Sequence, residues 1–164
     1  MADGPNEPAT VNPKWRPWLQ QFFDAHGAAT REDTQRAAGE HLLHLARSSV
    51  ATALRDVHAT TPLRPEVDID LLDGVIRISV VDGSYETPSM SRIDPAEALA
   101  EVADYLQTEL LGRREVGGVW PVCGLHAVGL HAQARDGVAV WWCQLGNHAV
   151  AAVGSLGTSQ PLGT

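Results

Sequence analysis

Apolar residues recur at helical spacing in the first third of the chain and predict two helices there. Pro17 opens a short aromatic segment that we expect to end at Gly27, because proline favours the first turn of a helix and glycine its end. A longer helix is predicted over 31–59, where apolar side chains form one stripe that would face a core. The stripe consists of Leu42, Leu45, Ala46, Ala53, Leu54 and Val57.

A third helix is predicted from its start signals as well as from its spacing. Asp94 is a favourable N-cap, Pro95 fits the first helical position, and Glu97 is placed to complete a capping box. Gly112 is the expected end. The apolar positions that would face the core are Leu99, Val102, Ala103, Leu106 and Leu110.

Between the second and third helices the pattern changes to strands. Residues 67–71 alternate apolar and polar side chains, and 75–81 return as a partner strand after the hairpin signal Asp73-Gly74. A short third strand is expected over 84–87. The fold class is therefore predicted to be α+β, with helices packed on a small antiparallel β-meander.

A second run of short strands follows the glycine pair Gly117-Gly118. Residues 130–134 and 138–142 predict a hairpin around the turn Asp136-Gly137, and 148–153 predict a last strand. The chain is thus expected to comprise a flexible arm (1–13), an α+β domain (14–115), a β-hairpin module (116–154) and a flexible tail (155–164).

This module contains both cysteines of the chain, and each has a histidine shortly after it. The pairs are Cys123-x₂-His126 and Cys143-x₄-His148. Two thiolates and two imidazoles are the ligand set of a four-coordinate zinc site, and four protein ligands leave no open position for a substrate. The sequence therefore predicts a structural zinc ion. The alternative is two buried free thiols, because cysteine is often buried without a metal.

The layout of residues 119–153 resembles a zinc ribbon in which histidine replaces the second cysteine of each knuckle. The resemblance implies a β-fold stabilised by zinc and implies no activity. The x₄ spacing of the second knuckle departs from the usual x₂, and His131 is a spare imidazole that could replace His126 or His148 as a ligand. Gly124 in the first knuckle and Gly146-Asn147 in the second are expected to let the backbone bend.

Charge is distributed unevenly along the chain. The 164 residues include 12 Lys+Arg and 20 Asp+Glu, for a net charge of −8, yet after residue 115 the charged side chains are Arg135 and Asp136 alone. Binding to nucleic acid depends on clustered basic residues that neutralise phosphates, so we expect no nucleic-acid partner. The abundant alanine, glycine and arginine with scarce lysine resemble small proteins of high-GC bacteria.

No apolar run is long enough to predict a membrane span, and the first residues lack the pattern of a secretory signal. We therefore expect a cytoplasmic protein with no membrane partner. In that reducing setting the two cysteines are better explained as metal ligands than as a disulfide.

Two aromatic clusters are candidate partner-binding surfaces. Trp18 and Phe22 lie in the first predicted helix, where they would either pack on the core or anchor a partner protein. Trp141 and Trp142 are adjacent in a predicted strand, so their side chains should point to opposite faces, one inward with Cys143 and one outward.

These features predict an accessory or assembly protein that works through contacts with a protein partner or with a second copy of itself. Two alternatives stay open: a zinc-containing regulator that contacts nucleic acid, and an enzyme whose zinc has three protein ligands and a water. No catalytic residue is predicted, because residues 116–164 contain no glutamate and Asp136, the one acidic residue there, lies in a turn.

Overall fold

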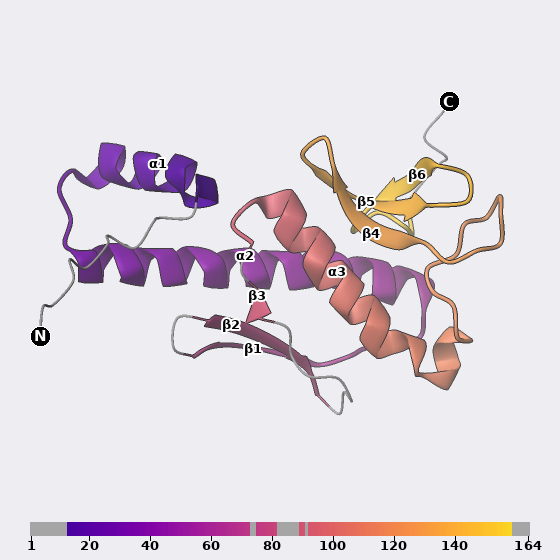
Figure 1. The fold of residues 1–164 in the computed structure, drawn as a ribbon. Coiled ribbons are helices and arrows are strands. Elements are labelled where there is room, and N and C mark those ends of the chain that lie inside the picture. Colours follow the sequence, from indigo (N-terminus) through magenta and orange to yellow (C-terminus); the bar gives the residue numbers. More distant parts are fainter. Residues whose placement is uncertain (1–12, 73–74, 82–88, 91, 159–164) are drawn as a thin grey trace, which may run out of the picture.

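The computed structural model describes residues 13–72, 75–81, 89–90 and 92–158. These residues form two three-stranded antiparallel sheets with helices between them, which confirms the α+β class (Figure 1). The helices are η1 (Pro13–Trp15), α1 (Arg16–His26), α2 (Arg31–Thr60), α3 (Pro95–Leu111) and η2 (Arg114–Val116). The strands are β1 (Val67–Leu72), β2 (Val75–Val80), β3 (Ser89–Met90), β4 (His131–Arg135), β5 (Val138–Cys143) and β6 (His148–Ala152).

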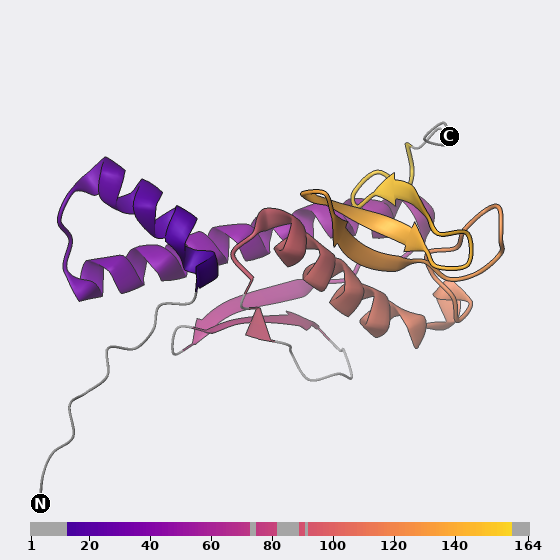
Figure 2. The ribbon, with the colours of Figure 1, turned by 45° about the horizontal axis from the view of Figure 1, so that its top comes forward.

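The long helix α2 is the central element of the fold. Thr30 caps it by accepting a hydrogen bond from the Asp33 amide at 3.1 Å, as expected for an N-cap. Its first buried residue is Leu42, so about three turns precede the part that is buried in the core. Figures 1 and 2 both show this first part of α2 extending beyond the sheets, with α1 alongside it.

The N-cap and the proline of helix α3 lie where the sequence predicts them. The Asp94 carboxylate accepts hydrogen bonds from the Ala96 amide at 3.0 Å and the Glu97 amide at 2.9 Å, and Pro95 occupies the first turn. The Glu97 carboxylate accepts from Lys14 at 2.8 Å. This contact joins the start of α3 to the segment before α1.

The first sheet has the order β1-β2-β3. The β1–β2 register, with Leu72 opposite Val75, agrees with the predicted hairpin, although the turn at 73–74 lies outside the described residues. The third strand predicted over 84–87 also lies outside the described residues. The strand that pairs with β2 in the structure is Ser89–Met90, through Ile76 opposite Met90.

The second sheet has the order β4-β5-β6 and contains the predicted C-terminal hairpin. Arg135 and Val138 flank the turn, and the two turn residues, Asp136 and Gly137, have φ values of 49° and 76°. Two successive left-handed residues are the signature of the tight turn that Asp-Gly favours.

A single hydrophobic core runs through α2, α3 and both sheets, and it crosses the predicted domain boundary at residue 116. On the far side of that boundary its buried members include Trp120, Leu130 and Trp141. Residues at the start of the predicted tail also contact the body, because the Leu156 amide donates to Asp56 of α2 at 2.7 Å. The second sheet is therefore packed against the helices.

Candidate metal centre

The four cysteine and histidine side chains predicted as ligands come together at one end of the second sheet. Cys123 and His126 lie in a knuckle closed by a bridge between Val122 and Gly129. Cys143 ends β5 and His148 begins β6, where the two residues are paired across the strands. All four ligand atoms lie within 4.8 Å of one another. They form a candidate metal site from two segments that are about twenty residues apart in sequence.

The distances within this group are those of ligands around a small cation. The Cys123 sulfur lies 3.4 Å from His126 Nδ1 and 3.6 Å from His148 Nε2, and the Cys143 sulfur lies 3.4 Å from His126 Nδ1. The histidines therefore present different ring nitrogens to the sulfurs. Nδ1 is the nitrogen nearer the backbone, which suits the shorter knuckle at His126.

The surroundings of Cys123 favour its metal-binding form. Burial raises the pKa of its thiol, but hydrogen bonds from the His126 imidazole, the Leu125 and His126 amides and the His148 imidazole outweigh burial and lower that pKa to about 6. At neutral pH the thiolate, which is the ligand form, is therefore the main species. Both cysteines are buried, whereas His126 is exposed, so the group is open to solvent on one side.

The backbone bends in this region at positions that differ in part from those predicted. In the first knuckle the left-handed residue is Ala127, with φ of 54°, and the glycine expected to bend there, Gly124, lacks such a conformation. In the second knuckle Asn147 is left-handed, with φ of 49°. The turn that contains Gly124 closes through the Ala127 amide, which donates to the Cys123 carbonyl at 2.8 Å.

Gly146 is required for a different reason, namely space. A Cβ atom at this position would overlap His126 Cε1 and would lie 2.7 Å from His148 Cδ2. The Gly146 amide also donates to the Cys143 sulfur at 3.4 Å. Both imidazoles thus pack directly over the Gly146 backbone.

We expect Gly146→Ala to weaken metal binding by about 10- to 100-fold, the usual effect of disturbing groups that orient ligands. The added methyl group would displace both rings from their positions, although the exposed His126 ring can move without unfolding the chain. Titration of the metal against a chromophoric chelator measures the affinity. Gly124→Ala is the matched control, because an added Cβ there meets no atom within 4 Å. Equal affinities of the two variants would contradict this account.

His131 does not belong to the group. It is an exposed residue of β4 opposite Trp142, and the metal-binding group of the described residues contains His126 and His148 instead. The group contains no carboxylate. Two thiolates and two imidazoles fit a tetrahedral metal.

The aromatic residues predicted as partner surfaces have different environments. Trp141 was predicted wrongly as a binding residue, since it is 0% exposed and its indole donates to Asp56 at 2.6 Å. Its side chain points inward with Cys143, as strand alternation predicts. Trp142 points to the other face, where the Arg135 guanidinium covers it at 4.0 Å from the ring centroid.

Trp18 and Phe22 lie on α1, a helix with no buried residue. Their rings stack at a centroid distance of 5.4 Å, and Trp15 and His26 extend the row at 5.3 Å and 4.8 Å from these two rings, respectively. The row is therefore a partly exposed aromatic surface, of which Trp15 also packs against the core.

Sequence reasoning did not identify Asp56, which fixes the second sheet to α2. It is fully buried, and its carboxylate accepts hydrogen bonds from Trp141 Nε1, from the Gly154 amide at 2.6 Å and from the Leu156 amide at 2.7 Å. Gln107 of α3 has a related role, donating to the carbonyls of Trp120 and Leu130 at 2.7 Å each. No sequence signal marks either residue, because their partners lie far along the chain.

Comparison with models of known protein families, with curated proteins and with solved structures finds no match to this chain. Among the helices that the structure describes, none combines the length and apolar character needed to cross a membrane.

Proposed function

We propose that the cysteine and histidine group binds one zinc ion. Tetrahedral zinc with bonds of about 2.3 Å to sulfur and 2.0–2.1 Å to nitrogen holds a sulfur and a nitrogen ligand about 3.5 Å apart. Three of the four sulfur–nitrogen pairs in this group, at 3.4, 3.6 and 3.4 Å, agree with that value. A mixed set of thiolates and imidazoles also suits zinc better than magnesium or calcium, which prefer oxygen ligands.

The proposed role of the zinc is structural. Four protein ligands complete its coordination, so a substrate or water would have to displace one of them. The ion would tie the first knuckle to the β5–β6 connection. These two segments have few buried residues of their own, and even their leucines, Leu125 and Leu145, are exposed.

We further propose that the protein acts through contacts with another protein or with a second copy of itself. The observation that carries this proposal is that α1 is rich in aromatic residues and buries none of them. Between α1 and the first turns of α2 lies a cleft of about 450 Å³, lined mainly by apolar side chains. Its lining residues include Trp15, Trp18, Leu19 and Phe23. Tryptophan and phenylalanine of this kind are frequent anchors of interfaces.

Charge favours a protein partner over nucleic acid. The chain has a net charge of −8, and Arg135 is the one basic side chain after residue 115. A surface that binds phosphates would need several clustered basic residues.

The double variant Trp18→Ala, Phe22→Ala is expected to lose association without unfolding, because neither residue is buried in the chain. Truncating interface anchors costs about 2 kcal/mol or more, which is roughly a 30-fold loss of affinity. Light scattering of the purified chain measures self-association, and crosslinking in native host extract measures partner capture. The matched control replaces Gln20 and Asp24, an exposed hydrogen-bonded pair of the same helix, by alanine. Retention of every association by the aromatic variant would contradict the proposal.

A further inference from the structure

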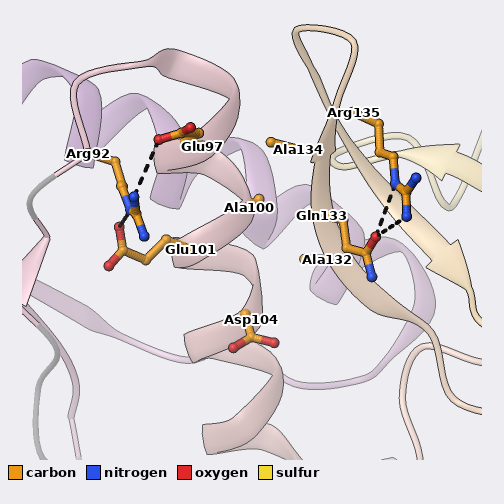
Figure 3. A pocket seen from close by; sticks show the side chains of 9 residues that line it. All are labelled: Arg92, Glu97, Ala100, Glu101, Asp104, Ala132, Gln133, Ala134 and Arg135. Atoms are coloured by element: carbon orange, nitrogen blue, oxygen red, sulfur yellow. Dashed lines mark hydrogen bonds and ion pairs between the residues drawn. The ribbon is translucent and has the colours of Figure 1, made fainter. Parts of the chain in front are cut away.

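A groove between α3 and β4 has the features of a site for an extended peptide. Its volume is about 670 Å³, within the range of about 300–1,000 Å³ typical of ligand sites. Figure 3 shows its two walls, with acidic residues along α3 on one side and β4 on the other. The lining residues are Arg92, Glu97, Ala100, Glu101 and Asp104 from the α3 side and residues 132–135 of β4.

The β4 wall presents backbone groups to the groove. β4 is an edge of its sheet, and Arg135 pairs with Val138 across a two-residue turn. Residues that flank such a turn exchange their backbone hydrogen bonds, and the groups of alternate residues point to opposite edges. The amides and carbonyls of Ala132 and Ala134 therefore point away from β5.

This outer edge faces α3. Leu130 precedes Ala132 and Ala134 at the same two-residue interval, so its backbone groups point to the same edge. Its carbonyl accepts a hydrogen bond from Gln107 of α3 at 2.7 Å. Among the backbone hydrogen bonds of the described residues outside the regular helices and strands, none involves Ala132 or Ala134. An edge with unpaired amides and carbonyls is a template for one more strand, and the two small side chains leave room for it.

The α3 wall is acidic. Glu97, Glu101 and Asp104 lie on one face of the helix, at spacings of four and three residues. Arg92 lies between the first two, 3.6 Å from Glu97 Oε2 and 3.9 Å from Glu101 Oε2. The Glu101 Oε2 atom is buried and has no hydrogen-bond partner among the described residues. Burial also raises the pKa of Glu101, so a donor that reached this carboxylate would relieve a desolvated group.

We propose that this groove binds an extended segment of another protein, which adds to β4 as a fourth strand and directs basic side chains to Glu101 and Asp104. Side chains two apart on one face of a strand are about 6.6 Å apart, and helix residues three apart have Cβ atoms about 5–6 Å apart. A segment with lysine or arginine at two positions separated by one residue therefore fits the two carboxylates. Neither Glu101, Asp104 nor β4 lines the cleft beside the aromatic helix α1, so the inference stands on its own observations.

A second copy of the chain is a poor occupant. In each copy α3 lies along the outer edge of β4, so the two β4 edges could not meet without displacing the helices. A single extended segment needs no such rearrangement. Its backbone would pair with Ala132 and Ala134, and its side chains would alternate between the α3 wall and solvent.

The test is selection of displayed random heptapeptides on the zinc-loaded full chain, followed by affinity measurement with the synthetic form of the best peptide. We expect enrichment of basic residues two positions apart, and we expect NMR shifts on titration to be largest at the Ala132 and Ala134 amides. Ala134→Pro removes an edge amide that the sheet does not use. Asp104→Lys reverses an exposed charge on the other wall. Each is expected to lower affinity at least tenfold while zinc content and circular dichroism stay unchanged.

The outcomes separate this inference from the proposed function. Enrichment of acidic or uncharged peptides, shifts centred elsewhere, or full affinity in the Asp104→Lys variant would overturn it. The inference would also be overturned if basic peptides were enriched no more on the native chain than in a parallel selection on the Asp104→Lys variant. None of these results bears on association through α1, which the Trp18→Ala, Phe22→Ala variant tests separately.

Discussion

Replacing Cys143 by alanine is expected to abolish binding of the zinc ion and to loosen both knuckles. Cys143 lies at the end of β5, and its sulfur is 3.4 Å from His126 Nδ1. Loss of a direct ligand should cost more than the about 10- to 100-fold that follows from disturbing an outer-shell group. Because zinc binding to such a site also contributes to folding, the segments that the metal joins should lose order with it.

The rest of the sheet is expected to stay folded, since Trp141 and Leu130 are held by the core and not by the metal. Elemental analysis should find one zinc per chain in the native protein and none in the Cys143→Ala variant. Hydrogen exchange should show lost protection in residues 122–129 and 143–148, with α2 and α3 unchanged. His131→Ala is the control, because this exposed histidine lies outside the group. A variant that retains stoichiometric zinc would disprove the assignment.

The second large effect is expected at Asp56. Asp56→Ala would leave three donors, Trp141 Nε1 and the amides of Gly154 and Leu156, without their acceptor. An unsatisfied buried polar group costs about 1–3 kcal/mol, so the free energy of unfolding should fall by about 3 kcal/mol or more. Domains of this size have about 5–15 kcal/mol in total. The variant should therefore be only marginally folded.

Urea denaturation followed by tryptophan fluorescence measures this loss directly, because Trp141 is one of the three donors. Asp104→Ala is the control for removing a carboxylate from an exposed helix position, and such changes usually alter stability by less than about 0.5 kcal/mol. Asp56→Asn keeps one acceptor oxygen and should fall between the two. If Asp56→Ala is as stable as Asp104→Ala, the carboxylate does not hold the second sheet in place.

Local signals predicted most of the secondary structure and the grouping of the candidate metal ligands. Some features depend only on residues a few positions apart, so the local sequence is enough to predict them. Examples are the Asp94 cap, the Asp136-Gly137 turn and the apolar stripe of α2. The same holds for Cys123-x₂-His126 and Cys143-x₄-His148, because the intervening hairpin was itself predictable. The four side chains could be grouped before their distances were known.

Long-range contacts could not be predicted in this way. Asp56 follows Arg55 in a helix and gives no hint that it is buried, since its partners lie 85 to 100 residues later. The steric need for Gly146 depends on two rings folded over it. The sequence alone also left two roles open for the aromatic residues of α1, and only the arrangement of α1 against the projecting end of α2 shows that none of them is fully buried.

The sequence separation of Asp56 from its donors also sets an order of events during synthesis. At about 5–20 residues per second, the 100 residues between Asp56 and Leu156 take roughly 5–20 s to emerge from the ribosome. Until Trp141 emerges, 85 residues after Asp56, the Asp56 carboxylate has none of its three donors, and its last donor, the Leu156 amide, arrives only at the end of that interval. A nascent chain is therefore expected to keep the part of α2 around Asp56 uncovered until the second sheet arrives, the condition in which chaperones bind.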